Sequence, residues 1–387
     1  MTIYFDNSAT TPVDPRVTER MVPWFTENFG NPSSLHALGR QAREAVEHAR
    51  GQIATLLGAR PREILFTASG SEANNLALLG TIAAGGPGPH HLVTDAIEHP
   101  AILETVHALE KQGVEVTILP VDRVGRVAPE DVAQSLRPHT RLVSIMAANN
   151  VIGTVQPIAE IARIVHAAGV RFHTDAVQAV GKLPIDLAAE PIDLLSLSAH
   201  KLHGPKGVGA LYVREGVALA PIIHGGGQER GLRSATENVA GIIGFGLAAE
   251  LADREMAEDN ARLVGLRDHM IAGITAMCPS AYLIGDPLRR LPGHVCLGFA
   301  GIEGEAIRLL LALDEAGIAA SAGSACSASH GAEPSYILRA LGFDPFRARG
   351  ALRLTLGRFN TAGEVEHVLE VLPKLVVGLR RIATPRP

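Results

Sequence analysis

Two side chains in this sequence stand out as candidates for covalent chemistry, one thiol and one amine. The thiol is Cys326, which lies in the run SAGSACSASHG at 321–331. Small residues and glycine surround it, so the backbone there has wide conformational freedom. Cys278 and Cys296 lie in ordinary surroundings and are interpreted as structural thiols. A segment of this kind suits the movement of one reactive thiol, although a surface loop with an incidental cysteine fits the same residues.

The amine is Lys201, which follows the strand-like run at 194–197 within the sequence SAHK and precedes a Gly/Pro turn. The chain has few lysines, so few amines are available to form a Schiff base. Lys201 is the candidate because it is expected at the end of a strand. The others are interpreted as solvated charges: Lys111, Lys182, Lys206 and Lys374.

A Schiff-base cofactor with a phosphate group needs an anion site and an acid, and both have candidates. Residues 66–72, FTASGSE, run from a strand into a helix, which places free N–H groups and the positive end of the helix together. A plain helix cap at Ser71 explains the same residues. Asp175 follows another strand, with Gln178 three residues on, and can keep a pyridine nitrogen protonated. A cap on the next helix explains Asp175 equally well.

These groups fall at the junctions of predicted strands and helices. After Gly30-Asn31-Pro32, a helix capped by Ser33 or Ser34 is predicted to end at Gly58. Strand-like runs then alternate with helical stretches, at 64–66, 91–94, 114–119, 142–146, 170–174 and 194–197. This alternation predicts an α/β fold, with a mainly parallel sheet covered on both faces and ligand sites at the carboxyl ends of its strands.

The C-terminal part has a different pattern. A long helical stretch runs from about residue 237 to near 275, and strands follow near 281–284, 294–299 and 350–355. We interpret this part as a smaller α+β domain that also receives the N-terminal residues. The predicted division is a large domain at 16–257 and a small domain made of 1–15 and 258–387.

Composition limits the class of protein. The 387 residues are 47% hydrophobic and 19% charged, which is typical of a soluble globular enzyme. The net charge of −5 argues against a nucleic-acid partner, and no run is apolar enough to predict a membrane span or a secretory leader. Three cysteines are too few for a disulfide scaffold, so we expect a cytoplasmic protein. No metal ligands are assigned.

In their order along the chain, these motifs resemble those of the cysteine desulfurases. These are pyridoxal 5'-phosphate enzymes of aminotransferase class V, and the resemblance is to the NifS/IscS group rather than to the group with a shorter cysteine loop. It extends from DNSATTP at 6–12 to about Arg358-Phe359. It implies the fold of type I pyridoxal-phosphate transferases, with a seven-stranded type of sheet in the large domain.

The resemblance also implies roles for residues that match the family motifs. Lys201 would bind the cofactor aldehyde, Asp175 would pair with the pyridinium nitrogen, and His99 would stack on the ring and move protons. The remaining cofactor contacts would come from Gly70, Ser71, Asn150, Gln178, Ser198 and His200. Arg353 would bind the substrate carboxylate through its planar fork, assisted by Asn31 and Asn150.

The implied reaction converts L-cysteine to L-alanine and leaves the sulfur on Cys326 as a persulfide. The cysteine loop, about 321–333, would carry this sulfur to an acceptor such as an iron–sulfur scaffold or a thiolation carrier. The sulfur would then supply iron–sulfur cluster assembly or thiolation pathways.

The glycine-rich segment 224–236 resembles one through which a subunit reaches its neighbour's phosphate, here with Thr236. This implies a homodimer with shared active sites.

Three departures from the family pattern stand beside this resemblance. The phosphate turn reads ASGS, where the family more often has an earlier glycine and a final threonine, and Ala235 replaces a usual glycine. The chain also stops at Pro387, without the longer tail by which some members engage the scaffold.

Two other interpretations stay open. One is a selenocysteine lyase or other class V enzyme that does not need Cys326, and the other is a non-catalytic partner protein of a sulfur pathway.

Overall fold

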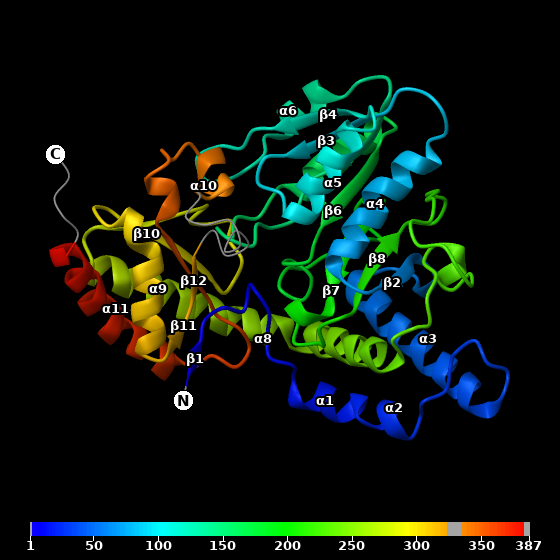
Figure 1. Cartoon of the computed structure of the whole chain (residues 1–387), viewed down its shortest axis with the longest axis horizontal. Coiled ribbons are helices and arrows are strands. Elements are labelled where there is room, and N and C mark those ends of the chain that lie inside the picture. The colour runs from blue at the N-terminus through cyan, green and yellow to red at the C-terminus, as the bar shows by residue number, and fades with distance from the viewer. Residues whose placement is uncertain (1, 323–333, 383–387) are drawn as a thin grey trace.

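The computed structural model describes residues 2–322 and 334–382, so Cys326 and most of the predicted cysteine loop lie outside the described residues. Figure 1 shows a larger layered part and a smaller one, with helix α8 (Val239–Met277) running along the base of both. The N-terminal residues lie in the smaller part.

The larger part is built on a mixed sheet with the strand order β2-β8-β7-β6-β5-β3-β4. The strands are β2 (Ile64–Thr67), β3 (His91–Asp95), β4 (Glu115–Leu119), β5 (Thr140–Ser144), β6 (Arg171–Asp175), β7 (Leu194–Ser198) and β8 (Gly209–Val213). All neighbours are parallel except β8, which is antiparallel to β2 and β7. The predicted mainly parallel sheet is confirmed, and β8 is a strand that the sequence analysis missed.

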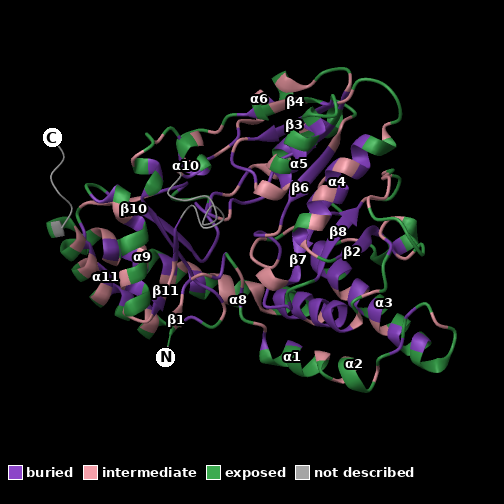
Figure 2. Ribbon diagram, viewed as in Figure 1, coloured by how far each residue is buried: buried purple, intermediate pink, exposed green. Residues whose placement is uncertain are grey.

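Helices cover both faces of this sheet. Along β3, Leu92 belongs to the buried cluster that contains residues of α4 and α5, whereas Val93 belongs to the one that contains residues of α3, α7 and α8. This alternation follows from the two-residue period of a strand. Figure 2 shows the central strands buried and the outer faces of the helices exposed. The helices of this part are α1 (Pro15–Met21), α2 (Pro23–Thr26), α3 (Ala37–Leu57), α4 (Gly70–Ala84), α5 (Pro100–Glu110), α6 (Pro129–Ser135) and α7 (Ile158–Ala167).

The ends of α3 test the cap prediction. Its N-cap is His36, whose Nδ1 accepts from the backbone N–H of Gly39, so the predicted cap at Ser33 or Ser34 is wrong by two or three residues. The predicted end is right, because Gly58 adopts a left-handed φ of +63° after the last turn.

The smaller part has an antiparallel sheet in the order β12-β13-β10-β9 and a short parallel pair, β1 with β11. Their bounds are β1 (Ile3–Tyr4), β9 (Ala281–Leu283), β10 (His294–Phe299), β11 (Ile318–Ala319), β12 (Ser321–Ala322) and β13 (Ala351–Thr355). Its helices are α9 (Ala306–Glu315), α10 (Tyr336–Ala340) and α11 (Ala362–Ile382). Short 3₁₀ turns are η1 (Pro61–Glu63), η2 (Ala199–Lys201), η3 (Glu229–Gly231), η4 (Glu303–Glu305) and η6 (Arg347–Arg349).

Each sheet has its own hydrophobic core, and α8 contributes to both. Ile242 and Ala249 pack in a core of the large sheet, whereas Met270 and Ile274 pack in the core of the small sheet. The predicted boundary near residue 257 falls inside this continuous helix, so the division into two domains stays a prediction. Over the described residues, no helix combines the length and the apolar character that a membrane span requires.

Candidate active site

A cavity of about 360 Å³ lies between the carboxyl ends of strands in the large sheet and strand β13 of the small sheet. This volume is within the range of small-molecule sites. Most of the predicted site residues line it: Gly70, Ser71, His99, Asn150, Asp175, Gln178, Ser198, His200, Lys201 and Arg353. Residues from the N-terminus, Ser8 and Ala9, form another part of its wall.

Lys201 reaches this cavity from the 3₁₀ turn η2 directly after β7. Its Nζ donates to the backbone carbonyls of Ser8 and Ala9, both at 2.6 Å. The N-terminal segment thus lies across the amine and accepts its hydrogen bonds. Ser8 is held in turn, because its backbone N–H donates to Thr355 Oγ1 at 2.9 Å.

Asp175 is the last residue of β6 and is only 6% exposed. Its Oδ2 accepts from Asn74 Nδ2 at 2.7 Å, and its Oδ1 accepts from the backbone N–H of Val177 at 3.0 Å. Sequence reasoning missed Asn74, although it lies four residues after Gly70 and therefore on the same face of α4. The two hydrogen bonds hold the carboxylate in one orientation toward the cavity.

His99 is the N-cap of α5, and its Nδ1 accepts from the backbone N–H of Ala101 at 3.0 Å. Because Nδ1 is an acceptor, the neutral ring carries its proton on Nε2. Burial lowers the pKa of His99, the nearby charge of Lys201 lowers it further, and the carboxylate of Asp175 opposes both. The structure therefore favours a neutral imidazole with an Nε2–H donor.

Two buried acids beside His99 were not identified in the sequence. Asp95 and Glu98 are fully buried, and burial raises the pKa of Asp95 to about 7 and that of Glu98 well above its usual value. The protonated form of Glu98 is the one that this environment favours, because an ionised carboxylate without partners is costly to bury.

The predicted helix after β2 is present, but its cap differs from the predicted one. Helix α4 begins at Gly70, and its N-cap is Ser69, whose Oγ accepts from the backbone N–H of Glu72 at 3.1 Å. The plain-cap interpretation of Ser71 is wrong, and Ser71 lines the cavity instead. A side chain at Gly70 would come within 2.7 Å of Val177 Cγ2, so glycine keeps the helix N-terminus close to the loop after β6.

Arg353 enters from β13 and is only 3% exposed. Its guanidinium donates to the carbonyl of Asn150 at 3.0 Å and to Asp6 Oδ1 at 2.8 Å. Among the described residues, neither Nε of Arg353 nor Oδ1 of Asn150 has a hydrogen-bond partner. Buried polar atoms of this kind are normally satisfied, so they suit contacts with a polar ligand.

The remaining predicted residues of the cavity have defined contacts. Gln178 Nε2 donates to the carbonyl of Ser8 at 2.9 Å, and Ser198 Oγ lies 3.5 Å from the carbonyl of Val208. His200 Nδ1 lies 3.1 Å from Thr10 Oγ1, and burial together with nearby lysines lowers the pKa of His200 to about 4.

Three predicted residues are not part of this cavity in the described chain. Thr236 is exposed just before α8, and Asn31 is exposed with its Oδ1 accepting from the backbone N–H of Ser33. Cys326 lies outside the described residues. A further interpretation is wrong: Lys182 is not a freely solvated charge, because the residue is only partly exposed and its amine donates to Gln178. The described residues contain no cluster of His, Cys, Asp and Glu suited to a metal ion.

Comparison with known proteins agrees with this geometry. The family described as "Aminotransferase class-V" matches residues 3–368. The chain is 49% identical over 385 residues to "Cysteine desulfurase IscS" of Methanosarcina thermophila, covering 100% of this chain and 94% of that protein. It is 47% identical over 382 residues to "Cysteine desulfurase NifS" of Azotobacter vinelandii, covering 98% of this chain and 94% of that protein.

Solved structures show the same relationship. A "NIFS-LIKE PROTEIN" superimposes with a TM-score of 0.91 at 39% identity, covering 98% of this chain and 100% of that chain. "SspA in complex with cysteine" superimposes with a TM-score of 0.82 at 37% identity, covering 93% of this chain and 100% of that chain. The chain therefore belongs to the class V aminotransferase family, with the type I transferase fold. Within that family it belongs to the cysteine desulfurases of the NifS and IscS type, as the sequence motifs predicted.

Proposed function

We propose that this protein is a pyridoxal 5'-phosphate-dependent cysteine desulfurase that converts L-cysteine to L-alanine and transfers the sulfur to Cys326. The observation that carries the proposal is the convergence of an amine, an imidazole, a carboxylate and a guanidinium on one cavity. The identity of about 50% to proteins named cysteine desulfurase, over nearly the full chain, supports the same activity.

The residues of the cavity fit pyridoxal 5'-phosphate. The N-terminus of α4 offers backbone N–H groups to a phosphate, and glycine at position 70 lets this terminus lie close to Val177 and Ser198. Asp175 offers its carboxylate to a pyridine nitrogen. The phosphate would be held by Gly70, Ser71, Ser198 and His200, and the ring hydroxyl by Asn150 and Gln178. When bound, this cofactor supplies an electron sink for the carbon that loses a proton.

Three side chains carry the proton and charge steps in this proposal. Lys201 would bind the cofactor aldehyde, and its amine would take the proton from the substrate Cα and return one. Asp175 would keep the pyridine nitrogen protonated, and Asn74 holds its carboxylate in place. His99 would stack on the ring, and its Nε2–H is the available donor because its Nδ1 is engaged with Ala101.

Arg353 orients the substrate through its carboxylate. Asp6 and the carbonyl of Asn150 fix the guanidinium plane, while Nε has no partner among the described residues. Because the guanidinium is almost fully buried, its attraction to a carboxylate is screened less than at the surface.

Cys326 completes the reaction in this proposal, on the basis of the sequence motif. Its thiolate attacks the sulfur of the substrate, so that a new S–S bond forms while the Cβ–S bond breaks. The electron pair remains with the substrate carbon, which takes up a proton and gives alanine. The persulfide on Cys326 then passes to an acceptor, such as an iron–sulfur scaffold or a thiolation carrier. Three cysteines in 387 residues support a reducing, cytoplasmic setting.

A second copy of the chain completes the site in this proposal. Large apolar side chains stand exposed in one stretch between α1 and α3: Val22, Phe25, Phe29, Leu35 and Leu38. Exposed apolar patches of this kind mark interfaces. Thr236 would then reach the phosphate of the neighbouring subunit, and Asn31, in the same exposed stretch, would lie near its substrate.

The test is turnover of L-cysteine by protein loaded with pyridoxal phosphate in the presence of a reductant. We expect equimolar alanine and sulfide from the wild type, neither product from Lys201→Ala, and loss of both with Cys326→Ala. Undiminished products from Lys201→Ala would contradict the proposed function. Undiminished products from Cys326→Ala alone would overturn the role of the thiol and leave the cofactor site standing.

A further inference from the structure

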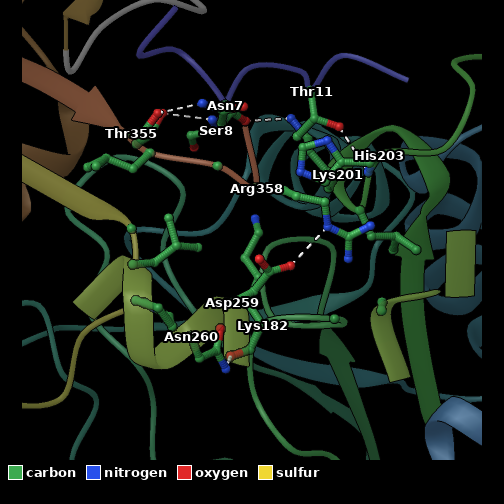
Figure 3. A pocket seen from close by; sticks show the side chains of 18 of the residues that line it. Asn7, Ser8, Thr11, Lys182, Lys201, His203, Asp259, Asn260, Thr355 and Arg358 are labelled. Atoms are coloured by element: carbon green, nitrogen blue, oxygen red, sulfur yellow. Dashed lines mark hydrogen bonds and ion pairs between the residues drawn. The ribbon is translucent and has the colours of Figure 1, made fainter. Parts of the chain in front are cut away.

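A second, smaller cavity of about 50 Å³ is also lined by Lys201 (Figure 3). Ser8 and Lys201 line both cavities, so they form the wall between them. Lys182 lines the second cavity and not the first. Its charged and titratable neighbours around this cavity are Lys201, His203, Asp259, His294 and Arg358.

Lys182 is held at both ends. Its Nζ donates to Gln178 Oε1 at 3.1 Å, and its backbone carbonyl accepts from Asn260 Nδ2 on α8 at 2.8 Å. The carboxylate of Asp259 in the same cavity accepts from Arg358 Nε at 2.9 Å (Figure 3). Burial lowers the pKa of Lys182 to about 7, with a smaller contribution from Lys201. The amine keeps N–H donors in both of its charge states.

The contact between Lys182 and Gln178 determines which way the Gln178 amide faces. One end of this amide receives a hydrogen bond from Lys182, and the other end donates to the carbonyl of Ser8. An ammonium group only donates and a carbonyl only accepts, so a single orientation of the amide satisfies both partners. In that orientation the NH₂ group lies toward the wall of the larger cavity, which Gln178 also lines.

The same carbonyl of Ser8 accepts from Lys201 Nζ at 2.6 Å. Lys182, Gln178, Ser8 and Lys201 therefore form a continuous chain of hydrogen bonds that runs from the second cavity to the amine in the first. A flipped Gln178 amide would place an oxygen opposite the Ser8 carbonyl, and two acceptors repel each other. The chain is thus sensitive to the donor at its outer end.

We propose that Lys182 is a positioning residue, which acts through Gln178 to present an N–H donor to the ring hydroxyl of the cofactor and to keep the Ser8 carbonyl aligned on Lys201. This inference rests on the proposed function. It names a residue that touches neither cofactor nor substrate. Replacing Lys182 by methionine keeps an unbranched side chain that is one atom shorter and removes the donor.

The experiment titrates cofactor-free protein with pyridoxal phosphate and records the absorbance spectrum and the dissociation constant. We expect Lys182→Met to bind about tenfold more weakly, the loss typical of one hydrogen bond to a charged group, with a shifted spectrum. Lys182→Arg retains a donor and is expected to restore most of the affinity. Lys111→Met, at the exposed end of α5, is the matched control and should bind as the wild type does.

A double-mutant cycle tests whether Lys182 acts through Gln178. The double variant Lys182→Met/Gln178→Ala is expected to bind no more weakly than Gln178→Ala alone. Fully additive losses would overturn the inference, as would a Lys182→Met protein with wild-type affinity and spectrum. If Lys182→Met does not fold, Lys182→Leu decides, because its side chain carries no donor and unchanged binding would contradict the proposal. If the wild type binds no pyridoxal phosphate, that result would instead contradict the proposed function itself.

Discussion

The two sheets contribute to the site in different ways. The large sheet supplies His99, Asp175 and Lys201 from the ends of β3, β6 and β7, where the topology of parallel strands gathers loops at one edge. The small sheet supplies Arg353 from the middle of β13, an antiparallel strand that is buried throughout. The main groups assigned to the cofactor thus follow strands of the large sheet, whereas the guanidinium assigned to the substrate carboxylate comes from the small sheet.

The supports of these groups differ as well. Asp175 is held by Asn74 and Val177, both within the large part. Arg353 is held by Asp6 from the N-terminus and by Asn150 from the large part, so its position depends on how the two parts meet. We infer that cofactor affinity and substrate recognition can be changed separately by substitutions in the two sheets.

The largest separate effect is expected from Asp175→Asn. The substitution keeps the size of the side chain and removes the negative charge opposite the pyridine nitrogen, so we expect turnover of L-cysteine to fall by about 10²–10³-fold. Steady-state assays of alanine formation measure this. Asn74→Ala, which removes only a partner of Asp175, should lose less, and an Asp175→Asn enzyme with full turnover would contradict the assignment.

Arg353→Lys is expected to change substrate recognition while leaving the cofactor in place. A lysine is a point charge that cannot form the planar two-point contact with a carboxylate, so kcat/KM for L-cysteine should fall by about 10–100-fold, mainly through KM. Absorbance of the bound cofactor should stay as in the wild type. Arg308→Lys, on the exposed face of α9, is the matched control. Equal losses of cofactor binding and substrate binding would contradict the inference that the two sheets control them separately.

Gly70→Ala tests the close contact beneath the phosphate turn. The added methyl would meet Val177 Cγ2 at 2.7 Å, so we expect a loss of up to about 3 kcal/mol in the free energy of unfolding and weaker binding of pyridoxal phosphate. Gly51→Ala is the control, because nothing lies within 4 Å of its added methyl on the helix α3. That variant should be slightly more stable than the wild type, by about 0.5–1 kcal/mol. Denaturant unfolding measures both.

A smaller effect is expected from pH through His173, inside the large sheet. Its ring lies between Ser144 Oγ at 2.8 Å and Ser196 Oγ at 3.0 Å, and burial lowers its pKa to about 3. The unfolded chain takes up a proton below pH of about 6.5 while the folded chain does not, so stability falls as the pH decreases. Between pH 7 and pH 5, the wild type should lose about 2 kcal/mol in the free energy of unfolding because of His173. The variant His173→Gln should not show this loss. Parallel pH profiles for the two proteins would contradict this.

The sequence predicted the strands of the large sheet better than the side-chain contacts of the candidate site. The six expected strands are present because their apolar runs and helical connections are local patterns. The strand β8 was missed, although Gly209–Val213 is a similar apolar run. Asp175 and Lys201 follow strands and could be placed by topology, whereas His99 was identified only by resemblance to a family. Arg353 had no local signal as a substrate ligand and was identified only by resemblance to a family.

The errors have a common physical cause. Ser69 rather than Ser71 caps α4, because the choice between neighbouring serines depends on where the backbone leaves β2. Lys182 looked like a surface charge because nothing in its neighbours along the chain reveals the cavity formed by α8 and the small sheet. Such features depend on contacts between distant segments, which local patterns do not encode.

The most direct test of the central claim is to locate the amine that binds the cofactor. Protein loaded with pyridoxal phosphate is reduced with borohydride, which fixes the cofactor covalently to that amine, and is then digested for peptide mass mapping. We expect the label on the peptide that contains Lys201, next to the groups that both sheets bring to the larger cavity. A label on Lys182 or Lys206 in place of Lys201, or no label at all, would contradict the account.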